Sequence, residues 1–368
     1  MKRFIDTYFP GPADIGNFSK EERTDIRKQY INSVLPVKIN NPNNGTYVLE
    51  KYLVSGTYGD VFQAINSKGA EVALKITLAQ DEDIKEALAY SLLTPTCGAY
   101  ILCLLDAFKY TLEGDTWLIQ VQPLMDGDLL EIVPDYDDIG YLLVILLFAA
   151  DCLHQQGIAH MDIKPENVFY KNISDTLAYK LGDLGLSCAA QVRKASVGGL
   201  VGEINLCKFS GTYIPPDMIR DGLDVGKYIT FTQAKKIDLW GIGTTIYLLL
   251  AQLNYYPLSM IEKFYSSEII NVANGSFWTN PNSFKQGETV NSKFFTPVLQ
   301  NTQKYLNQDT IEDALGQLLL LYNKQTPSAR DILRQIVRQQ GWAKLGEEDA
   351  YIEQSKAKFQ NDCALPSK

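Results

Sequence analysis

The stretch HMDIKPEN at residues 160–167 is the part of the sequence that indicates both fold and chemistry most strongly. Within six residues it offers a carboxylate, an ammonium group and an amide, on Asp162, Lys164 and Asn167. The carboxylate can orient a hydroxyl or accept its proton, the ammonium group can neutralise a phosphoryl group in transfer, and the amide offers a carbonyl oxygen to a hard divalent cation. The stretch therefore predicts a site for phosphoryl transfer.

A second carboxylate follows in the stretch LGDLG at residues 181–185. Asp183 can occupy a further metal position, and Gly185 allows the chain to turn sharply after it. Triplets of the form D-x-G are common in turns. The indication of a metal-binding residue therefore comes from the position of Asp183, sixteen residues after Asn167.

A glycine-containing turn lies further upstream, in VSGTYGDV at residues 54–61. Because it sits between two strand-like runs, Gly56 and Gly59 can bring the turn close to a phosphate and offer backbone N–H groups to it. An ordinary hairpin with two turn glycines explains the same stretch. The stretch therefore indicates a phosphate-binding turn only together with the other motifs of the sequence.

A single lysine interrupts the apolar run VALKI. If Lys75 points inward it needs an anionic partner, because an unpaired buried ammonium group is costly. Glu86 on the predicted helix 83–93 can be that partner, since Tyr90 lies one turn further along the same inward face. The alternative is a lysine that reaches into solvent from an edge strand.

In this order, the four motifs resemble the motif set of eukaryotic-type protein kinases. The resemblance runs from about residue 47 to residue 339, and it extends to SGTYIPPD at 210–217 and DLWGIG at 238–243. The first of these resembles the end of an activation segment, and the second resembles a buried helix whose aspartate braces the catalytic loop. The resemblance implies an α+β fold of two lobes, with a small antiparallel β-sheet lobe and a larger mainly helical lobe. It also implies ATP- and Mg²⁺-dependent transfer of the γ-phosphate to Ser or Thr hydroxyls of protein substrates.

The resemblance also implies roles for individual residues. The catalytic residues would be Asp162, Lys164, Asn167 and Lys75, and the metal ligands Asn167 and Asp183. The nucleotide-binding residues would be Val54, Gly56, Thr57, Gly59, Val61, Ala73, Lys75, Glu86, Gln122, Leu124 and Met125. Two alternatives stay open: Glu82 in place of Glu86, and Val121 in place of Gln122 at the back of the adenine pocket, whose hinge is expected at 122–126. Ser or Thr is favoured over Tyr as the acceptor because Lys164 follows Asp162 by two residues.

Several positions depart from the family pattern, among them Asp217 in place of a glutamate and Thr326 in place of its arginine partner. Val54 replaces the first glycine of the turn, Leu184 replaces a phenylalanine, and Met161 replaces the arginine of the usual H-R-D. Without that guanidinium, the chain lacks the group that would pair with a phosphate on the activation segment. We therefore hypothesise that activity does not depend strictly on phosphorylation there. We expect the segment 183–217 to be mobile without a ligand.

Two other functions compete with the catalytic one. A nucleotide-binding pseudokinase would act as a scaffold or regulator, but such proteins usually lack the lysine, one of the two aspartates or the asparagine, and all four are present here. A small-molecule phosphotransferase of the same fold generally lacks Lys164 and the stretches at 210–217 and 238–243.

The chain of 368 residues divides into four predicted parts. These are an N-terminal extension at 1–45, the small lobe at 46–126, the large lobe at 127–345 and a tail at 346–368. An antiparallel meander is predicted in the small lobe between residues 47 and 78, with two further strands before residue 122. Helices are predicted at 20–34, 83–93, 139–156 and 237–253.

The composition indicates a soluble globular protein with an acidic surface. There are 34 Lys and Arg against 43 Asp and Glu, a formal charge of −9 that disfavours nucleic acid and anionic membranes as partners. The apolar stretches at 141–153 and 242–253 are shorter than the roughly 20 residues of a membrane-spanning helix. Acidic residues expected near the peptide side of the cleft favour substrates with basic residues near the acceptor, although a solvated acidic face is the alternative: Asp126, Asp128, Glu131, Asp135, Asp137, Asp138 and Glu166. The sequence does not indicate an oligomeric state.

Six cysteines occur, at positions 97, 103, 152, 188, 207 and 363, and no two of them form a C-x-x-C pair. We expect them to be reduced, buried thiols of a cytoplasmic protein, rather than a disulfide framework or a zinc site. The N-terminus has basic residues but no apolar segment behind them, so no signal peptide is expected.

Overall fold

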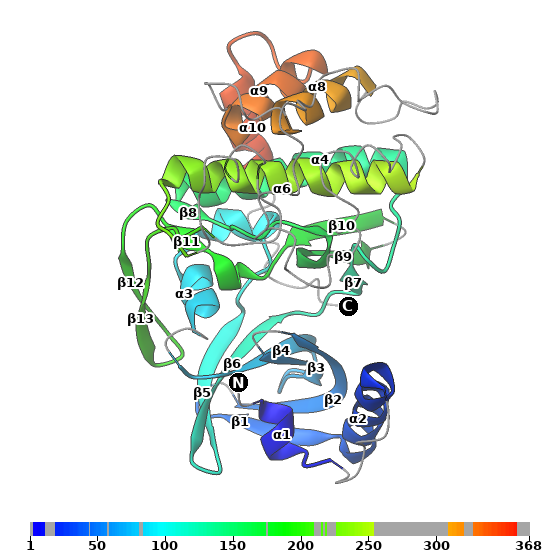
Figure 1. Ribbon diagram of the computed structural model, residues 1–368, viewed down its shortest axis with the longest axis vertical. Coiled ribbons are helices and arrows are strands. Elements are labelled where there is room, and N and C mark those ends of the chain that lie inside the picture. Colours follow the sequence, from blue (N-terminus) through cyan, green and yellow to red (C-terminus); the bar gives the residue numbers. More distant parts are fainter. Residues whose placement is uncertain are drawn as a thin grey trace.

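The computed structural model describes residues 3–11, 19–43, 45–56, 59–80, 84–173, 176–209, 215, 218, 226–253, 308–319 and 327–358. These residues form a small lobe built on one antiparallel sheet and a larger lobe built mainly of helices, one above the other in Figure 1. The expected α+β fold of two lobes is confirmed. The chain leaves the small lobe after β6 (Asp115–Pro123), so the predicted hinge at 122–126 lies at the crossing.

Six antiparallel strands make up the sheet of the small lobe, in the order β1-β2-β3-β4-β6-β5. Besides β6 they are β1 (Val37–Asn41), β2 (Gly45–Gly56), β3 (Gly59–Ile65), β4 (Glu71–Leu78) and β5 (Asp106–Leu112). The predicted meander corresponds to β2, β3 and β4. Because side chains alternate along a strand, the buried Asp60 and Phe62 of β3 share one face, which we call the outer face. Lys75 of β4 lies opposite Val61 on the other face, which we call the inner face.

The N-terminal residues cover the outer face. Helix α1 (Phe4–Tyr8) contacts β3 and β4, and α2 (Lys20–Val34) contacts β2. The predicted helix 20–34 is present, and a capping box between Ser19 and Glu22 explains where it begins. Phe4 belongs to the same buried apolar cluster as the outer-face side chains. The residues before β2 are therefore packed onto the small lobe.

Long helices dominate the large lobe. Helices α4 (Tyr136–Gln155) and α6 (Phe231–Gln252) lie side by side, with α8 (Gln308–Leu319), α9 (Ala329–Gln339) and α10 (Glu348–Lys358) beyond them (Figure 1). Both long helices begin earlier than predicted, because Asp135 and Thr230 accept hydrogen bonds from N–H groups of the first turns. Within the described ranges, no helix is long and apolar enough to cross a membrane.

Short elements fill the space between the sheet and the long helices. They are α3 (Lys85–Ser91), η1 (Pro95–Ala99), β7 (Gly127–Asp128), β8 (Ile158–Ala159), η2 (Pro165–Asn167), β9 (Val168–Ile173), β10 (Thr176–Leu181), η3 (Leu184–Leu186) and β11 (Cys188–Ala189). Strand β9 pairs with β10 and β7, and β8 pairs with β11. The last pairing holds the start of the HMDIKPEN stretch beside the segment that follows Asp183.

A β-hairpin follows β11. It consists of β12 (Arg193–Val197) and β13 (Leu200–Ile204), joined at Gly198 and Gly199, whose positive φ angles of 58° and 75° suit a two-residue turn. The hairpin lies beside α3 (Figure 1), and a Cβ atom on Gly202 would lie 2.7 Å from Leu88 Cδ1 of that helix. Within the segment 183–217, which is expected to be mobile without a ligand, β12 and β13 pair with each other and contact α3. Of the stretch 210–217, only Pro215 is among the described residues.

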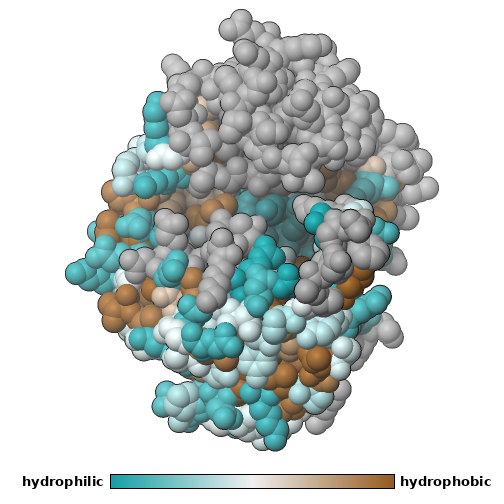
Figure 2. Space-filling view, turned by 60° about the horizontal axis from the view of Figure 1, so that its bottom comes forward, coloured by the Kyte–Doolittle hydropathy of each residue, from teal (hydrophilic) through white to brown (hydrophobic). Residues whose placement is uncertain are grey.

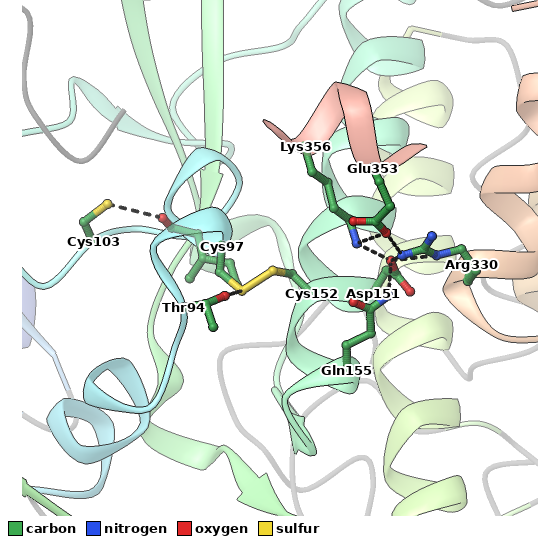
Figure 3. The surroundings of a disulfide bond; sticks show 10 residues. Thr94, Cys97, Cys103, Asp151, Cys152, Gln155, Arg330, Glu353 and Lys356 are labelled. Atoms are coloured by element: carbon green, nitrogen blue, oxygen red, sulfur yellow. Dashed lines mark hydrogen bonds and ion pairs between the residues drawn. A yellow bond between two sulfur atoms is a disulfide. The ribbon is translucent and has the colours of Figure 1, made fainter. Parts of the chain in front are cut away.

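The expectation of reduced cysteines is wrong. Cys97 and Cys152 form a disulfide between η1 and α4 (Figure 3), and Cys188 and Cys207 form a second one. Cys103 is also disulfide-bonded, and none of the cysteines in the described part of the chain is free. The paired residues are 55 and 19 positions apart, and only tertiary packing brings their Cα atoms to 5.7 and 4.8 Å. Spacing along the sequence therefore could not indicate these pairs.

Next to Cys152, a buried cluster of charges joins three helices. Asp151 of α4 lies 2.6 Å from Lys356 Nζ of α10 and 2.7 Å from Arg330 of α9 (Figure 3). Asp151 and Lys356 are each only 4% exposed. Helix α10, which belongs to the predicted tail at 346–368, is therefore attached to the large lobe through a buried ion pair.

Candidate active site

The candidate site lies between the inner face of the sheet and the large lobe. Figure 2 shows the surface hollowed beyond the small lobe, with hydrophilic residues at the floor of the hollow. Five side chains that could bind a ligand or take part in catalysis come together there from distant parts of the sequence: Lys75, Glu86, Asp162, Asn167 and Asp183.

Lys75 is held between two carboxylates. Its Nζ lies 2.5 Å from Glu86 Oε2 and 3.3 Å from Asp183 Oδ1. Burial alone would lower the pKa of this ammonium group, but the two carboxylates outweigh it and raise the pKa. Strand β4 lies between β3 and β6, so Lys75 is not a lysine that reaches into solvent from an edge strand.

Helix α3 supplies Glu86 and Tyr90 to the same site. Glu86 is 3% exposed and also accepts a hydrogen bond from Gln120 Nε2 at 3.4 Å. Tyr90, one turn further, accepts a hydrogen bond from the backbone N–H of Asp183 at 3.1 Å. Glu82, the alternative partner for the lysine, lies outside the described residues.

A buried aspartate of α6 fixes the backbone of the HMDIKPEN stretch. Asp238 accepts hydrogen bonds from the N–H groups of His160 (2.9 Å) and Met161 (2.7 Å). It also lies 2.8 Å from His154 Nε2, while His160 Nε2 lies 2.8 Å from the carbonyl oxygen of Gly182. Both histidines therefore have structural contacts. Met161 has a positive φ of 70°, a conformation that persists in a non-glycine residue only where the surroundings impose it.

Asp162 is oriented by two side chains of its own loop. Asn167 Nδ2 donates hydrogen bonds to the Asp162 carbonyl oxygen at 2.7 Å and to Oδ2 at 3.1 Å. Lys164 Nζ lies 2.9 Å from the same Oδ2. Burial lowers the pKa of Lys164, but Asp162 outweighs burial and raises it, so the ammonium group stays charged. The loop thus presents one carboxylate with a fixed direction and a cation beside it.

Asp183 adopts a left-handed backbone conformation, with φ 58° and ψ 74°. Its Oδ1 accepts a hydrogen bond from the N–H of Gly185 at 3.3 Å, in addition to the contact with Lys75. Burial by itself raises the pKa of Asp183, but Lys75 and then His160 outweigh it and lower the pKa. The carboxylate is therefore ionised at neutral pH, as a metal ligand must be.

The predicted nucleotide-binding residues lie along the inner face and at the hinge. Gly56 pairs with Gly59 at the end of the β2–β3 hairpin, and Thr57 lies outside the described residues. Val54, at 55% exposure, is on the surface of the same hairpin. Leu124 and Met125 follow β6 and are half-buried.

Strand register decides which residue lies at the back of this pocket. Gln122 lies opposite Ala73, and Gln120 lies opposite Lys75, so both glutamines face the inner side of the sheet. Val121 is opposite Leu74 and faces the outer side. The alternative of Val121 at the back of the pocket therefore does not fit the register.

Sequence reasoning missed the roles of Tyr90 and Gln120 in the site. Tyr90 served only as evidence of helix periodicity, and its contact with Asp183 joins residues 93 positions apart. A signal for Gln120 was present, since two glutamines alternate in the otherwise apolar strand WLIQVQP. A polar residue on a buried strand face requires a partner, which points toward a polar site.

Comparison with known proteins identifies the family. The model of the protein kinase domain matches residues 47–340. "Serine/threonine-protein kinase dkf-1" of Caenorhabditis briggsae is 30% identical over 279 residues, which cover 68% of this chain and 33% of that protein. Its namesake in Caenorhabditis elegans is 30% identical over 283 residues, covering 69% and 35%.

A plant protein shows a similar relationship. "CBL-interacting serine/threonine-protein kinase 18" of Arabidopsis thaliana is 25% identical over 303 residues, 74% of this chain and 54% of the plant protein. The chain spans about a third of the length of the two nematode relatives, so the similarity concerns one domain of those proteins. With a family model that covers most of its length and with the lysine, aspartates and asparagine gathered in one site, the chain belongs to the protein kinase family.

Proposed function

We propose that the chain is an ATP- and Mg²⁺-dependent protein kinase that transfers the γ-phosphate to Ser or Thr hydroxyls of protein substrates. The observation that carries the proposal is the position of Lys75 Nζ, 2.5 Å from Glu86 and 3.3 Å from Asp183. A phosphoryl-transfer site requires this lysine to be charged, oriented and close to the metal-binding carboxylate. The nucleotide and the metal ion, when bound, supply the transferable phosphoryl group and the charge that neutralises it.

The donor set fits magnesium, which prefers oxygen ligands. Asp183 would contribute its carboxylate and Asn167 its amide oxygen. Because Asn167 Nδ2 donates to Asp162, the Oδ1 atom on the other side of the amide is turned away from Asp162. In the part of the chain that the structure describes, no group of three or more His, Cys, Asp or Glu residues could hold a metal ion. Binding of the ion would therefore depend on the phosphates for its remaining ligands.

The other residues of the site would bind and orient the two substrates. Lys75 would hold the phosphates, and the backbone N–H groups between Gly56 and Gly59 would cover them. Asp162 would accept a hydrogen bond from the acceptor hydroxyl and take its proton, while the neighbouring ammonium group of Lys164 would stabilise the charge in transfer. Val54, Thr57, Val61, Ala73, Gln122, Leu124 and Met125 would enclose the rest of the nucleotide.

Activity would not depend strictly on phosphorylation of the activation segment. Met161 is 1% exposed and carries no charge, so it cannot pair with a phosphate there. The hairpin β12–β13 instead packs on α3 through Gly202, and α3 carries Glu86. Apolar packing would thus do what charge pairing does in kinases that need phosphorylation. Treatment with phosphatase should leave turnover within about twofold, and a loss that rephosphorylation restores would contradict this.

Peptides with basic residues near the acceptor hydroxyl would be better substrates than peptides without them. Of the acidic residues predicted to lie at the cleft, Asp128, Glu131 and Glu166 interact with one another: burial, together with the neighbouring carboxylates, raises the pKa values of Asp128 and Glu166. Asp126 is bound to Lys171 at 2.6 Å instead. A cation placed between these carboxylates would relieve their repulsion. A positional peptide library tests this, and equal rates with and without Arg or Lys near the acceptor would refute it.

A cytoplasmic location stays a prediction. The disulfides weigh against it, because disulfides persist mainly in oxidising compartments. Fractionation of expressing cells, with thiol labelling before and after reduction, measures both the location and the state of the cysteines.

The experiment that tests the function is transfer of labelled phosphate from ATP to a basic protein in the presence of Mg²⁺. We expect transfer by the intact chain and none by Asp162→Asn or Lys75→Met. Lys194→Met is the matched control, because the Lys194 side chain on β12 is 81% exposed and pairs with Glu203 instead of a residue of the site. If the intact chain transfers nothing while ATP raises its melting temperature, the alternative of a nucleotide-binding pseudokinase replaces the proposal.

A further inference from the structure

Asp60 is a fully buried carboxylate directly beside the glycine-rich turn of the small lobe. It follows Gly59 in β3 and has 0% exposure. Its Oδ2 accepts a hydrogen bond from the backbone N–H of Ile5 at 3.0 Å, and its Oδ1 accepts one from Ser55 Oγ at 2.7 Å. A carboxylate taken out of water needs such partners, because burial without them costs several kcal/mol. Asp60 thus connects the N-terminal segment to the turn.

The contacts of Asp60 lie at the base of the turn. Ser55 pairs with Asp60 across the β2–β3 ladder, one step before the pair of Gly56 and Gly59. Arg3 also donates a hydrogen bond from its guanidinium group to Ser55 Oγ. Both strands that lead into the turn are therefore bound to the N-terminal segment, one through Ser55 and the other through Asp60.

Aromatic side chains hold the segment in place. Phe4 is fully buried, and its ring makes edge-to-face contacts with those of Phe62, Tyr110 and Trp117 on the outer face. Phe9 also contacts Phe62. Because α1 has only five residues, it is not stable by itself and takes its position from these contacts. The rings fix the place where the N–H of Ile5 meets Asp60.

We propose that the segment 3–9 is a brace for the glycine-rich turn and that Asp60 is the positioning residue through which it acts. The inference rests on the proposed function, in which that turn covers the phosphates of ATP. Gly56 and Gly59 give the turn freedom, and a base bound to a packed segment limits the positions it samples. A turn whose ends at Gly56 and Gly59 are held in place loses less entropy when the nucleotide binds. The brace should therefore change the affinity for ATP more than the affinity for the peptide.

The test compares two aspartates of the same region. Asp60→Asn replaces one of the two carboxylate oxygens by an NH₂ group. Because that group cannot accept a hydrogen bond, the side chain loses either the bond from the Ile5 N–H or the bond from Ser55 Oγ. Asp25→Asn is the control, because Asp25 is exposed on α2 and lies outside the segment 3–9. Affinity for Mg²⁺-ADP is measured by calorimetry, KM for ATP and for peptide by kinetics, and amide exchange across residues 53–62 by mass spectrometry.

We expect Asp60→Asn to weaken nucleotide affinity and raise KM for ATP roughly tenfold, the effect of losing one hydrogen bond to a charged group. Exchange across the turn should rise, KM for the peptide should stay within twofold, and the control should match the unaltered chain. If Asp60→Asn does not fold, Phe4→Ala, which removes the anchor of α1, should show the same pattern.

Two results would overturn the inference. One is an Asp60→Asn chain whose nucleotide affinity equals that of the control. The other is a proportional loss of affinity for ATP and peptide together with a lower melting temperature, since that pattern marks a residue that serves stability only. Failure of the proposed function is distinguishable, because the unaltered chain would then bind Mg²⁺-ADP without transferring phosphate, or would not bind it.

Discussion

Tyr90→Phe should lower catalytic activity without unfolding the protein. The substitution removes one oxygen atom, which accepts a hydrogen bond from the N–H of Asp183 at 3.1 Å. The ring stays, and it fills the same buried space on α3, where Tyr90 is 5% exposed. The substitution removes the bond to Asp183 and also the interaction of the hydroxyl with Gln122, and the bond to Asp183 is the one that bears on the metal ligand. Because the backbone conformation of Asp183 is left-handed, with φ 58°, it depends on bonds of this kind more than an ordinary backbone would.

The magnitude follows from the loss of a single buried bond. An unsatisfied buried N–H costs about 1–3 kcal/mol, which corresponds to a factor of roughly 5–150 in the population of the active conformation. We expect kcat to fall within this range, with KM for the peptide unchanged. The concentration of Mg²⁺ needed for half-maximal activity should rise, because Asp183 would be the metal ligand that is displaced.

A matched tyrosine separates this effect from a general loss of packing. Tyr179 on β10 is also buried, but its hydroxyl has no hydrogen-bond partner among the described residues. Tyr179→Phe should therefore leave kcat, the Mg²⁺ requirement and the melting temperature unchanged or slightly improved. If Tyr90→Phe retains kcat within twofold of the unaltered chain, with the same Mg²⁺ requirement, the reasoning about Asp183 is refuted.

Three further predictions concern the surroundings of the site. Gly202→Val should crowd the buried side chains of Leu88 and Ile84 beside α3, because the new Cβ would lie 2.7 Å from Leu88 Cδ1 and 3.1 Å from Ile84 Cδ1. Overpacking of about 1–3 kcal/mol should lower kcat and raise KM for ATP, and an unchanged kinetic profile would contradict a role of the hairpin. Asp151→Ala should remove the buried carboxylate from Lys356 and Arg330, which then keep only the more exposed Glu353 and, for Arg330, Asp349. The loss of these charged contacts should cost about 1–3 kcal/mol in the free energy of unfolding, measured by denaturant titration, and a loss below 1 kcal/mol would show that the cluster relaxes. The pKa of Lys75 in the folded chain is raised above its ordinary value of 10.5. The contribution of its ion pairs to stability is therefore fully present below pH 10.5. It is lost only as the pH rises through the higher pKa of the folded chain. The pH profile of kcat/KM for ATP should accordingly show no alkaline limb from Lys75 below about pH 10.5, and a limb that disappears in Lys75→Arg would refute this.

Motifs whose residues contact one another within a short segment were predictable from the sequence. Residues 160–167 act within one loop, and the bonds between Asp162, Lys164 and Asn167 join positions at most five apart. Strand-like runs and helix periodicity were sufficient for β2 to β6 and for α3, but not for β1 (Val37–Asn41), which lies within the predicted N-terminal extension. The capping residues Asp135 and Thr230, four and seven positions before the predicted starts at 139 and 237, account for the earlier starts of α4 and α6.

Contacts between distant positions were not predictable from spacing. The disulfide between Cys97 and Cys152 and the bond between Ile5 and Asp60 each join residues 55 positions apart. Neither pair has a local signature, because cysteine in an apolar run and aspartate beside a turn glycine are both common. Their partners become visible only when the sheet and helices are assembled.

The position of α3 is the point at which these distant contacts converge. A helix of seven residues has little stability of its own, so its place depends on what surrounds it. Lys75 and Gln120 bind its glutamate from the sheet, Tyr90 binds the backbone of Asp183, and the hairpin packs on its other side at Gly202. The contacts that hold α3 are thus an ion pair, hydrogen bonds and apolar packing, and they meet on a helix of seven residues. Partners or modifications that displace the hairpin would therefore alter the Lys75–Glu86 distance.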